Sequence, residues 1–328
     1  MPASIEDVAR HAGVSTATVS RVLNGVDLVR PETKSKVEKS IAALGYRVSE
    51  SARSLRTSSR RQILVLVPDF SNPYYGEIVR GIESVAREHG YHVLLSETRT
   101  EGARKRAYVE LLQQQLADGV VCLDPVTIRR LAADGIVSFP WVACSEFLPD
   151  ADIPYVSIDH RQAAKDAVLY LLSRGHRNIG FVNSDERFIY AQQRRAGYED
   201  ALKEAGVDAR ADYIQSVGGV DYPLGELAAR RLLALEPRPT AIFAVSDTLA
   251  IGVMKASFRA GLKVPHDVAV VGFDDVPVAE MFEPSITTLA QPMYSLGQRA
   301  FSLLLQRIKG ESTTSEILPH RMVLRESA

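Results

Sequence analysis

The chain has 328 residues, of which 46% are apolar and 24% are charged; this composition excludes a disordered protein and suffices for two or three hydrophobic cores. No run of 18 apolar residues occurs, and residues 1–10 lack a basic segment followed by an apolar stretch. We therefore expect a cytoplasmic protein that is neither secreted nor inserted in a membrane. The net charge of −1 by itself points to no charged partner.

Residues 4–24, SIEDVARHAGVSTATVSRVLN, predict two short helices joined by a tight turn. Ser4 can cap the first helix, with Asp7 three residues later as its capping-box partner. Gly13 stands where the end of a helix favours a positive φ, and Ser15 can start the second helix. This spacing predicts a helix-turn-helix.

The second of these helices has an inner and an outer face. Val19, Val22 and Leu23 can pack inward, which leaves a small polar outer face formed by Thr16, Ala17, Ser20 and Arg21. Such a face can enter a major groove about 12 Å wide and present donors and methyl groups to base edges. An ordinary helical hairpin with a solvated outer face has the same spacing.

The charge distribution favours DNA binding over the ordinary hairpin. A third helix is predicted from Pro31 to a glycine stop at Gly45. Residues 1–61 hold 11 Lys and Arg against 6 Asp and Glu, whereas the remaining residues hold 28 against 34. A basic head on an acidic body is typical of a DNA-binding module joined to a domain with a different task.

Three segments together carry a family resemblance: VARHAGVSTATVSRVLNG, RPETKSKVEKSIAALGY and SARSLRT. They resemble the lactose/galactose-repressor (LacI/GalR) family of bacterial transcription regulators, in which the second helix reads half of a palindromic operator in double-stranded DNA. The resemblance implies that Thr16, Ala17 and Arg21 read the half-site, with Ser15 and Ser20 as phosphate or base-edge partners. Such a regulator would be associated with the nucleoid.

One head covers only half of a palindromic site, so we expect a two-fold homodimer. The final residues, RMVLRESA, lack the heptads through which tetramers of the family assemble.

Residues 48–61, VSESARSLRTSSRR, are rich in Ser and Arg and on composition alone predict a flexible linker. The family resemblance implies a hinge that becomes helical when two chains meet on DNA. Leu55 would then be the apolar wedge in the minor groove at the operator centre. The family often has Pro-Asn at the start of this hinge, whereas this chain has Val48 and Ser49.

From residue 63 onward, short apolar runs alternate with helical patterns, as in βαβ units. Candidate strands are 63–68, 92–97, 119–123, 178–183, 240–245 and 268–273, and candidate helices include 74–89, 161–174, 191–205, 248–260 and 293–308. Continuously apolar strands are typical of a parallel sheet buried on both faces. The length of this part exceeds one α/β unit of ~100–150 residues, so we expect two lobes.

Here the resemblance implies a fold like that of periplasmic sugar-binding proteins, with a ligand cleft between two similar lobes. The predicted fold class is α+α/β, with a three-helix head and hinge helix followed by two α/β lobes of this type. The predicted domains are a DNA-binding domain at 1–47, the hinge at 48–61 and an effector-binding and dimerisation domain at 62–328.

Open α/β sheets bind ligands outside the carboxyl ends of their strands, so the polar and aromatic residues that follow each strand are effector-site candidates. They are Asp69, Tyr74, Tyr75, Ser145, Glu146, Ser246 and Asp274. Asp247 can instead cap the next helix, and the two tyrosines can be core aromatics. Asp274 and Asp275 repel each other unless one has a partner, which a hydroxyl-bearing ligand could supply.

Two further candidates come from the segment around QRRAGYEDAL. The family has an arginine at the position of Arg194 that donates to effector oxygens, although by itself the residue would be interpreted as a solvated helix arginine. Tyr190, one turn earlier, could add an aromatic wall to the site.

The resemblance to one branch of the family indicates the class of effector. ILVLVPDFSNPYYGEIVRGIE, the Glu146-Phe147 pair and TTLAQP resemble the cytidine-repressor branch, which implies a nucleoside. The residues themselves suit a ribose and a hexose equally, because aromatic rings stack on either class. A sugar-responsive regulator is therefore the alternative.

Other classes of function lack support. The 2 cysteines, Cys122 and Cys144, lie in apolar runs and predict buried reduced thiols rather than a disulfide or metal site. The 7 histidines show no HExxH spacing, and no GxSxG motif occurs, so we expect no enzyme, metal or cofactor. A solute-binding protein of a transporter would share the fold expected for residues 62–328, but it would not need a DNA-binding segment such as residues 1–61.

Overall fold

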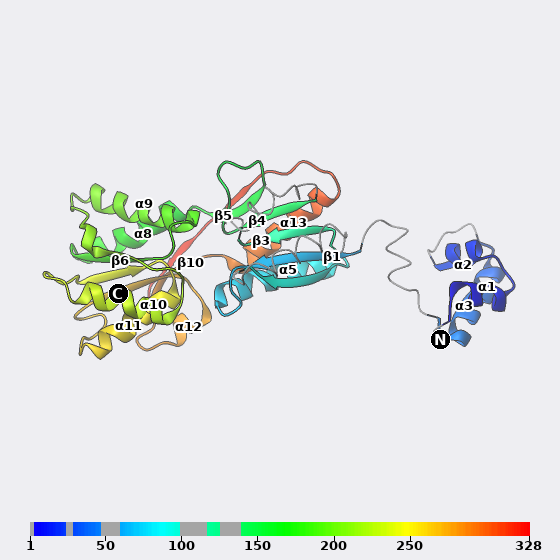
Figure 1. Cartoon of the computed structure of the whole chain (residues 1–328), viewed down its shortest axis with the longest axis horizontal. Coiled ribbons are helices and arrows are strands. Elements are labelled where there is room, and N and C mark those ends of the chain that lie inside the picture. Colours follow the sequence, from blue (N-terminus) through cyan, green and yellow to red (C-terminus); the bar gives the residue numbers. More distant parts are fainter. Residues whose placement is uncertain (1–2, 24–28, 47–59, 99–116, 125–138) are drawn as a thin grey trace. The chain divides into compact units, whose positions relative to one another are not determined.

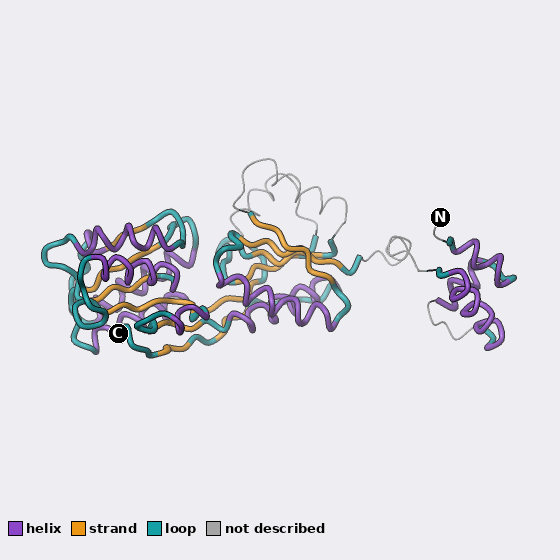
Figure 2. Tube along the Cα trace, turned by 90° about the horizontal axis from the view of Figure 1, so that it is seen from below, coloured by secondary structure: helices purple, strands orange, loops and turns teal. Residues whose placement is uncertain are grey.

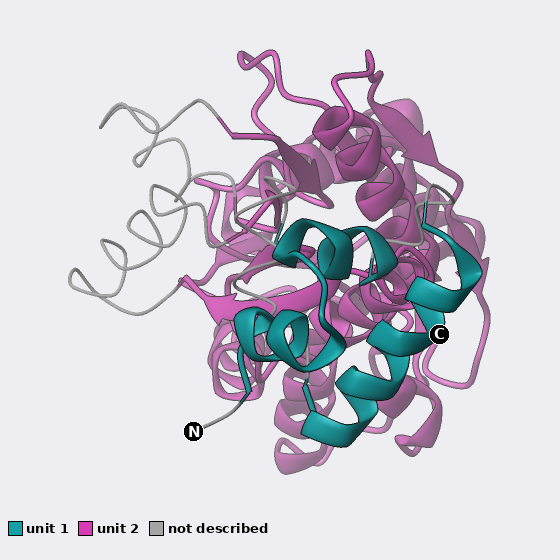
Figure 3. Cartoon of the chain, turned by 90° about the vertical axis from the view of Figure 1, so that its right-hand side faces the viewer, with its two compact units in different colours: residues 1–60 teal, residues 61–328 magenta. Residues whose placement is uncertain are grey.

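The computed structural model describes residues 3–23, 29–46, 60–98, 117–124 and 139–328. The chain divides into two compact units, residues 1–60 and 61–328, which are coloured separately in Figure 3. We describe each unit by itself and call them the head and the body. The hinge predicted at 48–61, including Leu55, lies outside the described residues except for its last two positions.

The head contains three short helices around a small apolar core. They are α1 (Ile5–Ala12), α2 (Thr16–Leu23) and α3 (Pro31–Leu44). The predicted capping box is confirmed, since Ser4 and Asp7 each accept a hydrogen bond from the other's backbone N–H. Gly13 has a φ of +66°, which allows the tight turn between α1 and α2. Val8, Val19 and Val37 are fully buried in the core, so α2 has the predicted inner face.

The body is built on two six-stranded sheets, one in each lobe (Figure 1). The first-lobe sheet has the order β11-β5-β4-β3-β1-β2 and is parallel throughout. Its strands are β1 (Gln62–Val67), β2 (His92–Glu97), β3 (Gly119–Cys122), β4 (Trp141–Cys144), β5 (Tyr155–Ile158) and β11 (Glu316–Leu318).

The second-lobe sheet has the order β12-β10-β9-β8-β6-β7. It is parallel except for β12, which pairs antiparallel with β10 at the edge. Its strands are β6 (Ile179–Asn183), β7 (Ile214–Ser216), β8 (Ala241–Ala244), β9 (Ala269–Asp274), β10 (Thr287–Ala290) and β12 (Arg321–Val323). The central strands are buried along their whole length, as expected from their continuous apolar runs.

Helices cover the sheets of both lobes (Figures 1 and 2). In the first lobe α5 (Pro73–Glu88) packs closely against α13 (Met293–Ile308). In the second lobe α8 (His160–Ser173) and α9 (Ile189–Glu204) lie on one face of the sheet, and α10 (Tyr222–Leu233) and α11 (Asp247–Arg259) lie on the other. A 3-10 turn (Ala211–Tyr213) and α12 (Pro277–Met281) complete the described elements.

The described chain passes between the lobes at three places: from β5 to α8, from β10 to α13, and from β11 to β12. We call these connections the crossings. All three crossings are short, so polar residues on them lie near the ends of strands. No helix in the described part of the chain combines the length and apolar character needed to cross a membrane.

Candidate functional site

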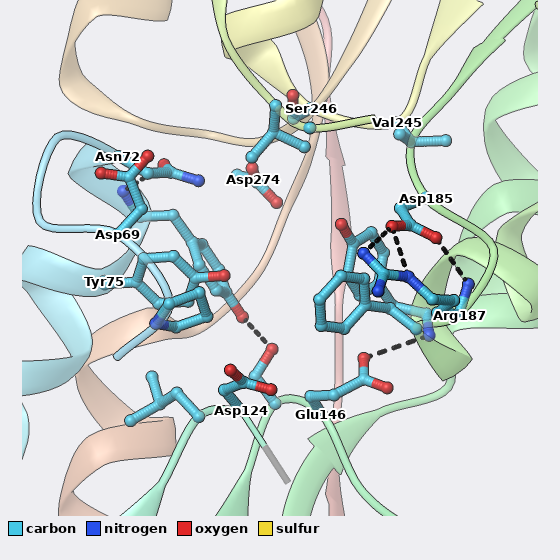
Figure 4. A pocket seen from close by; sticks show the side chains of 18 of the residues that line it. Asp69, Asn72, Tyr75, Asp124, Glu146, Asp185, Arg187, Val245, Ser246 and Asp274 are labelled. Atoms are coloured by element: carbon cyan, nitrogen blue, oxygen red, sulfur yellow. Dashed lines mark hydrogen bonds and ion pairs between the residues drawn. The ribbon is translucent and has the colours of Figure 1, made fainter. Parts of the chain in front are cut away.

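A cavity of about 260 Å³ opens between the two lobes, beside the carboxyl ends of their strands (Figure 4). All nine residues that the sequence proposed for an effector site line it: Asp69, Tyr74, Tyr75, Ser145, Glu146, Tyr190, Arg194, Ser246 and Asp274. The structure therefore brings together residues that are as far apart in the chain as Asp69 and Asp274. Their contact with an effector stays a prediction.

The charged centre of the cavity is formed by Arg194 and Asp274, both of which are buried. Arg194 Nη1 lies 3.9 Å from Asp274 Oδ1, and the guanidinium stacks 3.5 Å above the ring centroid of Phe273. Nη1 also donates to the Val245 carbonyl, while Nε is buried without a protein partner. Arg194 is thus a buried residue that lines the cavity and not a solvated helix arginine.

Burial raises the pKa of Asp274 to about 7, although Arg194 and a hydrogen bond from Gln291 act in the opposite direction. The backbone of Asp274 has a φ of +114°, and Ser145 across the cavity has a φ of +68°. L-residues adopt such angles at a cost of about 1–3 kcal/mol, and this kind of strain clusters at binding sites. Ser145 follows the end of β4 and Asp274 ends β9, and both residues line the cavity.

The two adjacent tyrosines of α5 have different roles. The Tyr74 hydroxyl lies 2.6 Å from Ser145 Oγ and donates to Gln291 Oε1 at 3.2 Å, so this residue is a buried core aromatic as well as a lining residue. Tyr75 packs edge-on against Tyr74, with the ring centroids 5.3 Å apart, and Figure 4 shows it directed into the cavity. Phe188 and Tyr190 stack on the side contributed by the second lobe. Aromatic walls therefore come from both lobes.

The partner expected for the Asp274–Asp275 pair comes from the protein rather than from a ligand. Asp275 Oδ1 accepts a hydrogen bond from Arg325 Nη2 at 2.7 Å, and Arg321 lies 3.6 Å from the other oxygen. This leaves Asp274 as the carboxyl group that lines the cavity.

The expectation that Asp247 caps the following helix is wrong. Ser246 is the N-cap, because its hydroxyl accepts a hydrogen bond from the Leu249 N–H. Asp247 is instead fully buried, where it accepts hydrogen bonds from Thr288 Oγ1 at 2.6 Å and from the Val276 N–H at 2.9 Å. It ties α11 to the ends of β9 and β10.

Glu146 connects the two lobes. Its carboxylate accepts hydrogen bonds from the backbone N–H groups of Ile189 at 2.5 Å and Tyr190 at 3.3 Å, the first two residues of α9. The N-cap residue of that helix, Phe188, provides no side-chain cap. Burial raises the pKa of Glu146 to about 8, and the two N–H groups oppose this shift.

Several lining residues were missed by the sequence analysis. They are Pro68, Asn72, Thr98, Leu123, Asp124, Asp185, Arg187, Phe188, Gly218, Gly219, Val220 and Val245. The same strand-end rule, applied to the predicted strands that became β2, β3 and β6, would have identified Thr98, Asp124 and Asp185. Gly218 follows β7, a short strand that the sequence analysis did not predict. Asn72 caps α5 through the Tyr74 N–H.

Metal and thiol chemistry find no support in this site. The described residues contain no group of three or more His, Cys, Asp or Glu side chains arranged to hold a metal ion. Cys122 and Cys144 are buried and free, and burial raises the pKa of the Cys144 thiol to about 12. The predicted burial of both cysteines is confirmed.

The head carries the second candidate site, on α2. Thr16, Ala17 and Arg21 are exposed, as is Ser15 just before the helix, whereas Ser20 is half-buried. The Ser15 hydroxyl accepts a hydrogen bond from the Thr18 N–H at 3.2 Å, which confirms its helix-starting position. The outer face of α2 thus has the predicted composition and is open.

A helix-turn-helix head joined to a two-lobed body with a polar cavity defines a ligand-responsive DNA-binding regulator. Two family matches agree with this class: residues 4–49 match bacterial regulatory proteins of the lacI family, and residues 60–326 match the periplasmic binding proteins and sugar binding domain of the LacI family. The chain belongs to the LacI family of bacterial transcriptional regulators.

The chain is similar over nearly its whole length to transcription regulators of known class. The HTH-type transcriptional repressor CytR of Escherichia coli K12 is 36% identical over 332 residues, which cover 99% of this chain and 96% of that protein. The lac repressor dimer bound to operator and the anti-inducer ONPF is 28% identical with a TM-score of 0.88, covering 100% and 99% of the two chains. The regulator CelR in complex with cellobiose is 32% identical with a TM-score of 0.76, covering 99% and 100%. These relatives are regulators and not enzymes, in agreement with the prediction.

Proposed function

We propose that this regulator is a repressor that binds a palindromic operator as a homodimer and changes its DNA affinity when a nucleoside binds between the lobes. The observation that carries the proposal is the pairing of Arg194 and Asp274 in a cavity walled by aromatic rings from both lobes. A sugar as effector is the alternative.

The DNA-binding part of the proposal rests on the head. Thr16, Ala17 and Arg21 project from an exposed helix face of the size that enters a major groove, and Arg21 can donate two hydrogen bonds to a guanine. Ser15 and Ser20 would contact phosphates or base edges. A single head covers one half-site, so two chains related by a two-fold axis are needed. The regulator would act on the nucleoid in the cytoplasm.

The charge balance of the cavity favours a neutral ligand over a phosphorylated one. Among the described lining residues, carboxyl groups outnumber guanidinium groups: Asp69, Asp124, Glu146, Asp185 and Asp274 stand against Arg187 and Arg194. Burial raises the pKa of Glu146 to about 8 and that of Asp274 to about 7, so these two add only part of a negative charge, and the other three still outnumber the guanidinium groups. Arg187 already pairs with Asp185 at 2.5 Å. Phosphate recognition relies on clustered cations, so a nucleotide or sugar phosphate fits this lining poorly.

The aromatic walls favour a nucleoside over a free hexose. Tyr75 lies on one side of the cavity and Phe188 and Tyr190 on the other, so a flat base can lie against a ring while the ribose hydroxyls reach Arg194 and Asp274. A nucleoside presents both parts in one molecule. A hexose could bind the same polar pair. It would contact the aromatic rings only through its apolar C–H faces, so part of the aromatic surface would stay uncovered.

A thermal-shift screen of the full chain tests the effector class. The compounds are cytidine, uridine, adenosine, their 5′-monophosphates, cytosine, ribose and cellobiose. We expect a nucleoside to raise Tm, since a ligand at 100 times its Kd stabilises by about 2.7 kcal/mol, and we expect the monophosphates to fail. A shift with the sugars alone would favour the alternative, and no shift with any compound would contradict the proposed effector site.

A further inference from the structure

Two buried side chains on the crossings link the charged pair of the cavity to the first lobe. His160 is the first residue of α8, directly after the β5 crossing, and Gln291 lies on the crossing between β10 and α13. His160 is fully buried and Gln291 nearly so, and neither is among the lining residues of the cavity. Both nevertheless contact the residues that we assign to effector binding.

The first connection runs from Arg194 through His160 to Ser145. Arg194 Nη2 lies 3.2 Å from His160 Nδ1, and His160 Nε2 lies 3.3 Å from the Ser145 carbonyl oxygen. A guanidinium can only donate, so Nδ1 must accept and the ring proton must be on Nε2, where it faces the carbonyl. The arrangement thus requires a neutral imidazole in one tautomer. Burial and the Arg194 charge both lower the pKa of His160, in agreement with a neutral ring.

The second connection runs from Asp274 through Gln291 and Tyr74 to the same serine. Gln291 Nε2 donates to Asp274 Oδ1 at 2.7 Å, and Gln291 Oε1 accepts from the Tyr74 hydroxyl at 3.2 Å. The Tyr74 oxygen lies 2.6 Å from Ser145 Oγ, which must then be the donor because the tyrosine proton is directed to Gln291. Both connections therefore end on Ser145, the residue with positive φ at the end of β4.

We infer that His160 and Gln291 are positioning residues of the effector site, which orient Arg194 and Asp274 and couple this pair to the two crossings that set the angle between the lobes. The inference rests on the proposed binding of an effector at this pair. A ligand that competes for the bonds of Arg194 or Asp274 also changes the bonds of His160 and Gln291. Since Gln291 lies on one crossing and His160 directly follows another, ligand contact is transmitted to the lobe angle without a further intermediary.

The tautomer of His160 tests the first connection in the unaltered protein. We would record ring ¹⁵N shifts in the full chain without any ligand, with the partly exposed His176 as the internal control. We expect His160 to be neutral at pH 7 with its proton on Nε2 and to stay neutral when His176 titrates. An Nδ1–H tautomer or an imidazolium at pH 7 would overturn the assignment.

The second connection is tested by the titration of the Asp274 carboxyl carbon. The groups that face this carboxyl are Arg194, Asp247, Tyr74, Tyr75 and Tyr190. Gln291→Met removes the amide donor and keeps a side chain of similar size. We expect the Asp274 midpoint to rise by about one pH unit, the equivalent of one hydrogen bond to a charged group, and to stay unchanged in Gln215→Met.

An unchanged Asp274 midpoint in folded Gln291→Met would contradict the role of Gln291. Gln291→Glu provides a second variant if the methionine variant does not fold, because a carboxylate in place of the amide must raise the same midpoint further.

Coupling to the ligand is measured with cytidine as the probe. Added cytidine should move the His160 ring signals and not those of His176, and His160→Asn and Gln291→Met should weaken cytidine binding about tenfold by calorimetry. Unaltered affinity in both variants would reject the positioning role. If cytidine does not bind the wild-type chain, the proposed nucleoside effector is wrong. The tautomer of His160 and the titration of Asp274 still test the two connections in that case.

Discussion

The carboxylate of Glu146 lies 2.5 Å from the backbone nitrogen of Ile189, so a side chain of the first lobe caps a helix of the second. The N-terminus of a helix carries unpaired N–H groups and a partial positive charge, both of which favour a carboxylate. Opening of the lobes would expose these groups and the carboxylate to water. Glu146 therefore links the first lobe to α9 of the second lobe, in addition to lining the cavity.

Glu146→Gln should reduce the pH dependence of stability. The pKa of Glu146 is raised to about 8 in the folded protein, so the stability associated with its proton is complete below pH ~4.5 and is lost as the pH rises through 8. Asp274, whose pKa is raised to about 7, contributes with the same sign. Between pH 5 and 8 the free energy of unfolding of the wild type should fall by up to about 1.4 kcal/mol per pH unit for each group whose pKa is raised. In Glu146→Gln the part of this fall that comes from Glu146 should be absent.

Urea unfolding at several pH values measures this effect, with Glu311→Gln at an exposed position as the control. Equal slopes for wild type and Glu146→Gln would show that Glu146 has an ordinary pKa.

Asp274→Asn should abolish the response to effector while leaving DNA binding intact. The amide keeps an acceptor for Gln291 but loses the charge that pairs with Arg194 and holds ligand hydroxyls. Loss of a charged hydrogen bond costs about 1.5–3 kcal/mol, which corresponds to a 10- to 100-fold weaker cytidine affinity. Calorimetry with cytidine and band shifts on an operator selected in vitro give the two readouts. Asp208→Asn, at an exposed site, is the control, and a retained response would show that the polar pair is misassigned.

The local features of the sequence predicted the structure well where a few neighbouring residues determine the outcome. The capping box of Ser4 and Asp7 and the turn at Gly13 depend on contacts within three or four positions. The strand-end rule located seven of the lining residues, and the family resemblance added Tyr190 and Arg194. Helix starts differed by one or two residues, as at α9, because its cap comes from Glu146, which is 43 positions earlier.

Contacts between distant positions of the chain could not be predicted from spacing. Arg325, the partner of Asp275, is 50 residues away, and Gln291 reaches Tyr74 across 217 positions. Such pairs depend on how strands are ordered in each sheet and on how the crossings set the two lobes. The same reason explains why the sequence does not reveal the role of Asp247: its donors, the Thr288 hydroxyl and the Val276 N–H, are adjacent only after β9 and β10 have paired.

Arg21→Ala should weaken operator binding and relax the base preference at one position. The residue is exposed in the last turn of α2, where a guanidinium can make a bidentate contact worth about 1–3 kcal/mol of discrimination. Competition band shifts with single-base operator variants measure both effects. Lys263→Ala, in the body, removes one positive charge elsewhere and should leave the preference unaltered. Full operator affinity in Arg21→Ala would refute its role.

Leu55→Ala should lower the ratio of specific to random DNA affinity. The family resemblance places this leucine as a wedge in the minor groove, where an apolar side chain unstacks a base step and bends the duplex. Without the wedge, the contacts that the bend permits are lost, and light scattering should still give a dimer. Ser54→Ala in the same segment is the control. An unchanged affinity ratio would indicate a passive linker.

Two glycine substitutions should change stability in opposite directions. A Cβ added to Gly272 would lie 2.2 Å from Asp247 Oδ1, and this carboxylate cannot retreat without breaking its hydrogen bonds to Thr288 and the Val276 N–H. Gly272→Ala should therefore destabilise the body by about 1–3 kcal/mol. Gly76 lies exposed in α5, with no atom within 4 Å of an added Cβ, so Gly76→Ala should stabilise by about 0.5–1 kcal/mol. Urea unfolding of the two variants distinguishes a steric clash at Gly272 from a general effect of replacing glycine, and equal stability of Gly272→Ala and wild type would mean that Asp247 moves freely.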